Sequence, residues 1–298
     1  MNATGLQATQ TFECEDGVTM KVRRLSDIMA AEVTGVDLSK PLTPKLKEAI
    51  LNAFLEHHLL AFRDQDLSPE QQHAFTLNFG EIEDHVARLA SGEKLPLVHV
   101  VNNLDKDGNP TPQPHSTGNY YWHTDKSYHE VPSLATLLHA IELPPDGGDT
   151  LFCNTYMAYR QLDAEQRSEL DGLRAIHSWE ASRRNTNNKP ATEEQKRERP
   201  PVSHPVVRTH PDTGEKLLYI GIHTSHIEGR PEPEGKQLLD DLLAHATKDE
   251  NIYRHKWHQG DLCMWDNRCT MHRADANYDM GKHRRILHRT VVRGTKPY

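Results

Sequence analysis

The chain has 298 residues, a net charge of −8 and 36% hydrophobic residues. This length accommodates one large β domain or two smaller domains, and the composition is typical of a water-soluble globular protein. The negative charge argues against a nucleic-acid-binding protein, and no apolar run is long enough to predict a membrane span. Four cysteines without paired spacing do not suggest a disulfide scaffold, so we expect a reducing, cytoplasmic location.

The N-terminal third predicts short strands and two helices. Residues 18–38 are typical of short strands, and "LLAFRDQ" predicts another. Thr43-Pro44 begins a helix in "LTPKLKEAILNAFLEHH", because threonine caps a helix well and proline suits its first turn. Ser68-Pro69 begins a second helix, which Gly80 ends.

Beyond residue 95, short apolar runs separated by Gly and Pro predict many strands, with helices at about 155–171 and 232–247. The strands do not alternate regularly with helices, so a sandwich or barrel is favoured over a doubly wound parallel sheet. Residues 180–201 are polar and helix-poor, which predicts a mobile insertion. Without a linker or repeat, we expect a single domain spanning residues 1–298.

The segment "YYWHTDKSYHE" at residues 120–130 combines aromatic bulk with two metal-ligand side chains. The aromatic residues favour an extended strand, on which His123 and Asp125, two positions apart, would point to the same face. A His-x-Asp pair with a distant second histidine is the ligand set of the facial triad, which holds Fe(II) and leaves open positions.

The His-x-Asp pattern alone is a weak signal, since roughly one occurrence is expected by chance among 20 histidines. A second copy, His210-Pro211-Asp212, lies in "RTHPDTGEK", where Pro-Asp-Thr-Gly predicts a hairpin turn capped by Asp212. The aromatic context therefore favours the first copy. His272 is the candidate third ligand, because "DLCMWDNRCTMHRAD" reads as a strand, an Asp-Asn turn and a second strand.

Positive charge is concentrated near the C-terminus. Residues 254–298 hold ten Lys or Arg against four Asp, a charge of +6, which leaves −14 on the rest of the chain. In "RRILHRTVVRG", strand alternation puts Arg285 and Arg289 on one face with Leu287 and Val291. Two buried guanidiniums are costly unless an anion meets them. An exposed edge strand with both arginines in water is the alternative that the residues alone leave open.

Several motifs resemble one known family. "YWHTD", "ELPPDGGDTLF", "HPVVRTHPDTGEKLLYI", "MWDNRCTMHRA" and "RRILHR" resemble the taurine dioxygenase / 2,4-dichlorophenoxyacetate dioxygenase family, and more closely its phenoxyacetate branch. "AAEVTGVDLSKPL" extends the resemblance over nearly the whole chain. The resemblance implies a mainly β fold with flanking helices around a double-stranded β-helix (jelly-roll, cupin-like) core. It also implies a dioxygenase that uses Fe(II), 2-oxoglutarate and O2.

The resemblance implies roles for individual residues. It makes His123, Asp125 and His272 the catalytic iron ligands, and Arg285 with Thr150 the residues that hold the distal carboxylate of 2-oxoglutarate. The expected substrate-binding residues are His85, Asn119, His223 and Arg289. For His226 and Arg88 two alternatives remain: a place near the substrate or a position on the surface. The loop "ANYDMGKH" is longer than in the taurine enzyme, and "YIGIHTSHIEG" lacks the aromatic residue that packs on taurine.

The implied reaction hydroxylates the carbon next to the heteroatom of a small anionic organic substrate. For an aryloxyacetate such as 2,4-dichlorophenoxyacetate, the products are a phenol and glyoxylate, with succinate and CO2 from 2-oxoglutarate. The alternatives are a taurine or alkylsulfonate dioxygenase that releases sulfite, a jelly-roll Zn hydrolase or isomerase, and a metal-free binding sandwich. A homo-oligomer without nucleic-acid or membrane partners is expected.

Overall fold

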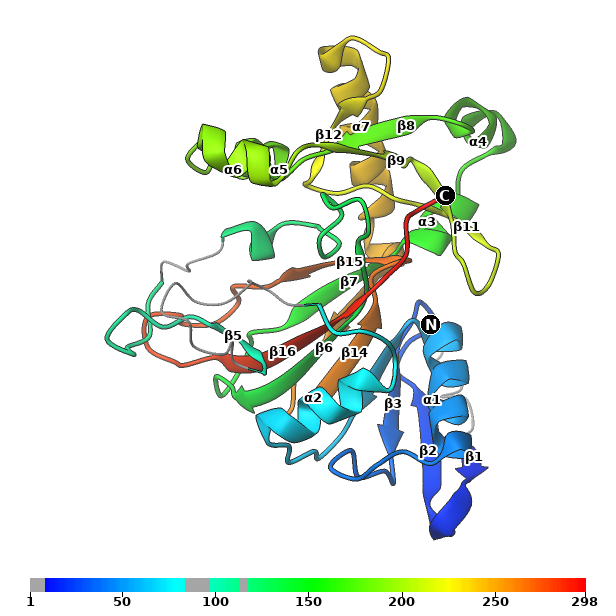
Figure 1. The fold of residues 1–298 in the computed structure, drawn as a ribbon, viewed down its shortest axis with the longest axis vertical. Helices are drawn as coiled ribbons and strands as arrows, with labels where there is room; N and C mark the ends of the chain where they lie inside the picture. Colours follow the sequence, from blue (N-terminus) through cyan, green and yellow to red (C-terminus); the bar gives the residue numbers. More distant parts are fainter. Residues whose placement is uncertain (1–8, 84–96, 113–116) are drawn as a thin grey trace, which may run out of the picture.

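The computed structural model describes residues 9–83, 97–112 and 117–298 and shows a mainly β molecule with helices around it (Figure 1). The mainly β class with flanking helices is therefore confirmed. Among the helices in these residues, none has both the length and the apolar character that crossing a bilayer requires. The candidate residues His85 and Arg88 lie outside the described residues.

Within the described ranges, the larger sheet has eight strands in the order β1-β2-β3-β4-β14-β6-β16-β5. Its pairings are antiparallel except for the parallel pair β3–β4. The strands are β1 (Gln10–Glu13), β2 (Thr19–Arg24), β3 (Ala31–Thr34), β4 (Leu59–Phe62), β5 (His99–Asn102), β6 (Ser133–Glu142), β14 (Leu262–Asp266) and β16 (Ile286–Arg293).

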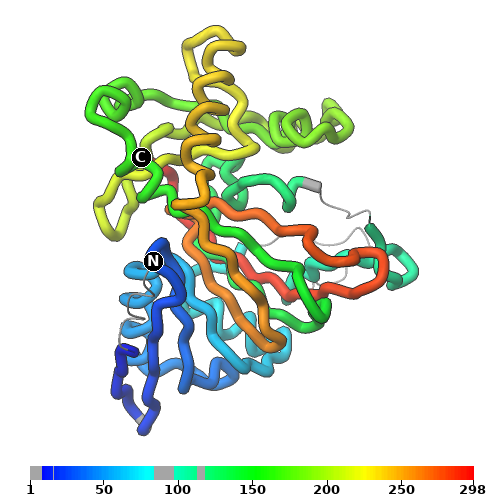
Figure 2. Tube along the Cα trace, turned by 180° about the vertical axis from the view of Figure 1, so that it is seen from behind, coloured from blue at the N-terminus to red at the C-terminus, as the bar shows by residue number. Residues whose placement is uncertain are grey.

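A second sheet, β13-β7-β15, packs against the larger one. One buried cluster contains Leu138 and Leu287 from the larger sheet and Phe152 from the smaller sheet, so the core lies between the two. Figure 2 shows the smaller sheet from the side opposite to Figure 1. Its strands are β7 (Thr150–Asn154), β13 (Ile252–His255) and β15 (Thr270–Ala274).

A second layer of short elements lies beyond the smaller sheet. The strands β8 (Arg174–His177), β9 (Val202–Pro205) and β12 (Thr224–Ile227) form a three-stranded sheet, and β10 (Val207–Thr209) pairs with β11 (Lys216–Leu218). The helix α7 (Glu232–Ala246) packs on β12 through Leu239 and Leu242, which join Ile227 in one buried cluster. The predicted hairpin at Pro211–Gly214 is confirmed.

The two N-terminal helices form as predicted. Thr43 caps α1 (Pro44–His57), and Ser68 caps α2 (Pro69–Leu77) through a reciprocal capping box with Gln71. Gln72 and Thr76 of α2 bond to the backbone of His288 and the hydroxyl of Thr290 at 2.9 and 2.7 Å. These bonds attach α2 to β16, the strand that carries Arg289.

Three local expectations are wrong. Residues 120–130 are not a strand: the 3-10 helix η2 (Thr117–Tyr120) is followed by an isolated bridge and a turn. The helix expected at 155–171 is divided into α3 (Thr155–Arg160) and α4 (Ala164–Leu170). The segment 180–201 is not helix-poor, because α5 (Trp179–Asn185) and α6 (Glu193–Glu198) form under caps from Ser178 and Thr192. Two further 3-10 helices in the described part of the chain are η1 (Glu15–Gly17) and η3 (Asp249–Asn251).

Candidate active site

A single β-bridge brings two histidines together. The backbone of His123 exchanges two hydrogen bonds with that of His272, at 3.1 and 2.8 Å. The two imidazole centroids consequently lie 4.2 Å apart. The Nδ1–H of His123 donates to the carbonyl of Tyr121 at 2.8 Å, which leaves its Nε2 free to act as a ligand.

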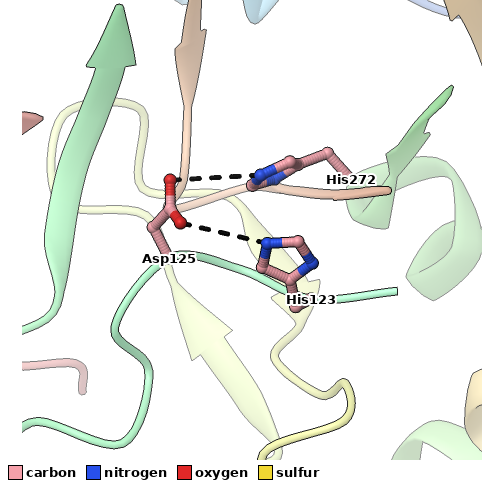
Figure 3. Close-up of side chains that lie close together, drawn as sticks. All are labelled: His123, Asp125 and His272. Carbon is pink, nitrogen blue, oxygen red and sulfur yellow. Dashed lines mark ion pairs between the residues drawn. The ribbon is translucent and has the colours of Figure 1, made fainter. Parts of the chain in front are cut away.

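Asp125 completes the group from the turn that follows. Its two carboxylate oxygens lie 3.9 Å from Nε2 of His123 and 4.0 Å from Nε2 of His272 (Figure 3). Burial favours a raised pKa, but the nearby His272, Arg289 and His123 outweigh it and hold the pKa of Asp125 below its usual range. The carboxylate is therefore ionised at neutral pH.

The three side chains suit a divalent transition metal. Their ligand atoms lie within 4.8 Å of one another, and each residue is 8% exposed. Two ligands of one ion, each bound at about 2.0–2.2 Å, are at most about 4.4 Å apart, so the observed spacing needs little adjustment. Burial, followed by the charge of His123, lowers the pKa of His272 to about 3, so this imidazole is neutral and offers a lone pair. Two neutral imidazoles and one carboxylate form the donor set of a facial triad.

One hydroxyl and one amide side chain hold Asp125 in place, and the sequence did not predict either of them. The hydroxyl of Thr136 donates to the Asp125 carboxylate at 2.5 Å. The amide of Asn267 donates to Thr136 Oγ1 at 2.8 Å and accepts from the backbone N–H of Asp125 at 3.4 Å. Asn267 lies in the turn that was recognised only as a turn, and Thr136 lies in a strand with no local mark of function. Their role depends on pairing between β6 and β14.

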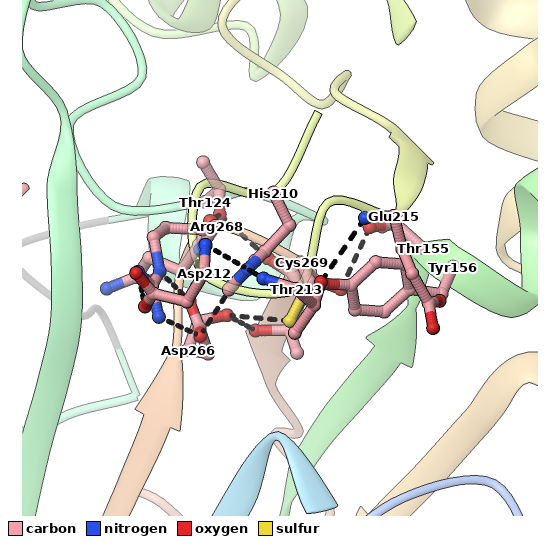
Figure 4. Close-up of polar contacts among 12 residues, drawn as sticks. Thr124, Thr155, Tyr156, His210, Asp212, Thr213, Glu215, Asp266, Arg268 and Cys269 are labelled. Atoms are coloured by element: carbon pink, nitrogen blue, oxygen red, sulfur yellow. Dashed lines mark hydrogen bonds and ion pairs between the residues drawn. The ribbon is translucent and has the colours of Figure 1, made fainter. Parts of the chain in front are cut away.

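The second His-x-Asp pair belongs to a different buried cluster (Figure 4). His210 donates from Nε2 to Asp266 at 3.1 Å, and its Nδ1 accepts from the backbone N–H groups of Asp212 and Thr213. The expectation that Asp212 caps the turn is therefore wrong, because His210 caps it. The carboxylate of Asp212 instead pairs with Arg268 at 2.6 Å.

This second cluster also brings a histidine, a carboxylate and a thiol close together, namely His210, Asp266 and Cys269. Arg268 pairs with Asp266 at 2.7 Å, and the neighbouring charge holds the pKa of that carboxyl down against the effect of burial. Both imidazole nitrogens of His210 are already engaged. The imidazole of His210 and the carboxylate of Asp266 are thus both engaged inside the protein and are not free to bind a metal.

A buried cation lies beside the triad. Arg285 is 8% exposed, and among the residues the structure describes no carboxylate forms an ion pair with it. Its Nε donates to the carbonyl of Gly148 at 2.9 Å, and its guanidinium lies 5.9 Å from the ring centre of Trp257. A Cβ on Gly148 would lie 3.2 Å from the Arg285 side chain, and φ there is +70°, so glycine suits this position. Burial lowers the pKa of Arg285, as expected for a cation without a fixed counter-ion.

Thr150 and Arg285 line the same small cavity. It has a volume of about 50 Å³ and also borders His123 and His272. The hydroxyl of Thr150 accepts from Nε1 of Trp257 at 3.0 Å. A neighbouring cavity of about 380 Å³ is lined by Arg285, Arg289 and Asn119. Arg285, which directly precedes β16, and Arg289 on that strand border the same two cavities, so the two guanidiniums lie on a common side as predicted.

A larger cavity of about 520 Å³ also borders the triad. Asn119, His223 and Arg289 line it beside His123 and Asp125. Arg289 lies 3.8 Å from Asp125, and the pKa of His223 is lowered to about 3 by burial and by His123. His226 bonds Ser225 through Nδ1 and does not border this cavity, so among the described residues the surface alternative is favoured for it.

The family model described as "Taurine catabolism dioxygenase TauD, TfdA family" matches residues 21–291. The chain is 39% identical over 276 residues to an alpha-ketoglutarate-dependent 2,4-dichlorophenoxyacetate dioxygenase of Cupriavidus pinatubonensis, covering 90% of this chain and 96% of that one. It is 33% identical to an alpha-ketoglutarate-dependent sulfate ester dioxygenase of Pseudomonas putida, covering 93% and 91%.

Among solved structures, the chain is similar to AAD-2 in complex with Mn(II) and N-oxalylglycine. The TM-score is 0.84 at 39% identity, with 93% of this chain and 98% of that chain covered. The similarity therefore extends over sequence and fold together.

Proposed function

Because the chain belongs to the taurine catabolism dioxygenase TauD, TfdA family, we propose that it is an Fe(II)- and 2-oxoglutarate-dependent dioxygenase acting on aryloxyacetates. The observation that carries this proposal is the compact His123–Asp125–His272 group beside the buried Arg285, which has no carboxylate partner among the residues that the structure describes. An iron ligand set and a cationic anchor for a dicarboxylate cosubstrate are the two parts that this chemistry requires. 2,4-Dichlorophenoxyacetate is the representative substrate, since a relative of that activity is 39% identical.

In this proposal His123, Asp125 and His272 hold the iron. When bound, iron with 2-oxoglutarate and O2 supplies the oxidising power: 2-oxoglutarate leaves as succinate and CO2, and one oxygen atom enters a substrate C–H bond. Thr136 and Asn267 keep the Asp125 carboxylate oriented between the two imidazoles. Fixed ligands on one side leave the other side free for cosubstrate and substrate.

Arg285 and Thr150 receive the distal carboxylate of 2-oxoglutarate. A guanidinium offers two parallel N–H donors to a carboxylate, so Arg285 gains the counter-ion that its burial requires. The hydroxyl of Thr150 adds one further donor, while Trp257 keeps that hydroxyl in position. These contacts orient the cosubstrate before any chemistry begins.

The substrate lies in the larger cavity with its carboxylate toward Arg289. Asn119 and His223 line the path to the triad, and His85 is proposed there by resemblance alone. The residues of the triad are themselves buried, which limits the access of water to the reacting carbon. Hydroxylation of the carbon attached to the aryl oxygen yields a hemiacetal. Its hydroxyl proton passes to the aryl oxygen as the C–O bond breaks, which gives the phenol and glyoxylate.

A sulfate ester is the second candidate substrate, because a sulfate ester dioxygenase is 33% identical. The two substrate classes differ in the anionic group that meets Arg289. The same triad and Arg285 would serve both reactions. A jelly-roll Zn hydrolase would leave Arg285 without a role.

A substrate panel tests the proposal. Aryloxyacetates, alkylsulfonates and alkyl sulfates are each incubated with Fe(II), 2-oxoglutarate and O2, and succinate release is measured. We expect the fastest release with aryloxyacetates, together with phenol and glyoxylate, and none in His123→Ala or Asp125→Ala. Fastest turnover of an alkylsulfonate or an alkyl sulfate would transfer the assignment to that class.

We also propose that the two facing sheets form the double-stranded β-helix and that the whole chain is one catalytic domain. A homo-oligomer and a cytoplasmic location are proposals of the same kind. Sedimentation and cell fractionation measure them.

A further inference from the structure

The larger cavity extends beyond the part that an aryloxyacetate carboxylate needs. Its volume of about 520 Å³ is within the range of sites that hold drug-sized ligands. Asp125 of the triad and Arg289 line one part of it. Trp179 and Arg183 on α5 and Arg199, directly after α6, line another part. The sequence predicted a mobile insertion over most of this α5–α6 segment, at residues 180–201.

The charges along this cavity are unevenly paired. Lys126 pairs with Glu83 at 2.5 Å, and Arg289 lies 3.8 Å from Asp125. Arg183 and Arg199 are half-buried, and within residues 9–83, 97–112 and 117–298 neither forms an ion pair with a carboxylate. The cavity therefore carries two unneutralised positive charges away from the triad.

Both guanidiniums lie against the same indole. The guanidinium carbons of Arg183 and Arg199 are 4.8 and 4.6 Å from the ring centre of Trp179. Each such contact stabilises a cation through the electron-rich face of the ring, but two like charges beside one ring also repel each other. An anion between or beside them would remove that repulsion.

The α5 helix is fixed relative to the rest of the cavity. The backbone N–H of Ser178 donates to the carbonyl of His223 at 2.8 Å. The amide of Asn185 donates to the carbonyls of Ile222 and Thr224 at 2.8 and 3.2 Å. These bonds attach both ends of α5 to the segment that carries His223, so Arg183 is held at a defined place in the cavity wall.

We propose that Arg183 and Arg199, supported by Trp179, form a second anion subsite and that the preferred substrate is a dianion. The inference rests on the proposed function: one acid group meets Arg289 near the triad, and a second, on the far side of an aromatic ring, meets Arg183 and Arg199. Tyr128 and Ile222 line the cavity and supply aromatic and apolar surface for the ring. The substrate class is thus an aryloxyacetate that carries a carboxylate, sulfonate or phosphate on its ring.

The test compares two substrates. 4-(Carboxymethoxy)benzoate is a dianion, and 4-(carboxymethoxy)benzamide is a monoanion because an uncharged amide replaces its ring carboxylate. In the wild type, kcat/KM from succinate release is expected to be about tenfold higher for the dianion, since a charge-assisted hydrogen bond distinguishes the two. The preference is expected to fall in Arg183→Gln and in Arg199→Gln, and to shrink as salt is added. Affinity for the same two compounds is measured by calorimetry on the enzyme loaded with Mn(II) and 2-oxoglutarate without O2, where the same ratio is expected.

Arg184→Gln is the matched control. Arg184 neighbours Arg183 on α5 but is exposed, pairs with Glu232 at 3.1 Å and does not border the cavity, so its variant is expected to keep the preference. Turnover of both compounds with equal kcat/KM in the wild type would overturn the dianion subsite and leave the proposed reaction standing. If no succinate formed while the dianion still bound about tenfold more tightly than the benzamide, the proposed reaction would be overturned and the anion subsite would stand. A preference that survives in both Arg183→Gln and Arg199→Gln would also overturn the subsite.

Discussion

Two buried clusters of this protein contain a histidine and an aspartate, yet they differ in what their side chains leave free. In the triad, Nε2 of His123 and Nε2 of His272 face one carboxylate at 3.9–4.0 Å, which is too long for hydrogen bonds. In the second cluster, Asp266 accepts from Arg268 and His210 at 2.7 and 3.1 Å. The first cluster therefore presents free lone pairs toward a common point. In the second cluster, hydrogen bonds from neighbouring side chains already occupy the lone pairs of Asp266.

The contrast shows why composition of a cluster is a poor guide to metal binding. Both groups are at least 90% buried, and both place their ligand atoms within 4.8 Å. A cation supplied by the protein, Arg268, takes the place that a metal would otherwise take beside Asp266. The spacing of donors and the presence of a fixed counter-charge therefore separate a candidate metal site from a structural network.

The largest expected effect concerns the cation beside the triad. Arg285→Gln is expected to raise the KM for 2-oxoglutarate by roughly 30-fold or more, because a buried charge-assisted pair contributes about 2–5 kcal/mol. Succinate release as a function of 2-oxoglutarate concentration measures it. Arg284→Gln is the control, since Arg284 is exposed and pairs with Glu142 at 3.0 Å. Equal KM values for the two variants would mean that Arg285 does not meet the cosubstrate.

The second cluster is expected to contribute to the stability of the fold and not to metal binding. Asp266→Asn leaves Arg268 with only its pair to Asp212, so we expect the free energy of unfolding to fall by about 3 kcal/mol. Urea unfolding measures this change. Asp171→Asn removes an exposed partner of Lys216 and is expected to have little effect. If Asp266→Asn were as stable as the wild type, the network would not be structural.

The hydroxyl that holds Asp125 has a smaller expected effect. Thr136→Val removes its 2.5 Å hydrogen bond and is expected to weaken Co(II) affinity by about tenfold, whereas Thr136→Ser is expected to restore it. Calorimetric titration of Co(II) into each variant measures the affinity. Unchanged affinity in Thr136→Val would show that Asp125 is positioned without this hydroxyl.

A buried histidine outside both clusters, His204, is expected to make the stability of the protein depend modestly on pH. His204 is fully buried, donates to the carbonyl of His129, and has its pKa lowered by burial to about 4. The unfolded chain binds this proton near pH 6.5 and the native state only near pH 4, so stability is complete above pH 6.5 and is lost as the pH falls toward 4. The contribution of this one group is at most about 1.4 kcal/mol per pH unit.

Urea unfolding at several pH values between 7 and 4.5 measures this dependence. His204→Gln is expected to lose stability less steeply than the wild type over that range. Parallel slopes for the two proteins would assign the acid sensitivity to other groups.

The elements with strong local signals could be predicted from the sequence. Thr43-Pro44 and Ser68-Pro69 begin helices where the Thr43 and Ser68 side chains cap free N–H groups. Arg285, just before β16, shares two cavities with Arg289 on that strand, as the alternation predicted. His123 and Asp125 were correctly selected as a pair that lies with His272, but for a local reason that is wrong. They meet across an isolated bridge to His272 and a turn, not on the face of a strand.

The parts that could not be predicted depend on contacts between distant segments. Thr136 reaches Asp125 only because β6 lies beside β14, which also brings Asn267 within reach. The sequence around Asp212 predicted that its carboxylate caps the turn. The carboxylate instead pairs with Arg268, which lies 56 residues away in the chain. The α5–α6 segment looked unstructured because its polar residues bury little apolar surface, while its caps and its bonds to Ile222 and Thr224 fix it.

The most direct measurement is the metal content of matched variants of the two clusters. Fe(II) is titrated without O2 into the wild type, Asp125→Ala and Asp266→Asn, at a protein concentration well above the dissociation constant of the wild type. We expect one iron per chain in the wild type and in folded Asp266→Asn, and none in Asp125→Ala, whose circular dichroism should match the wild type. Iron retained by Asp125→Ala, or lost only from folded Asp266→Asn, would show that the triad is not the metal site.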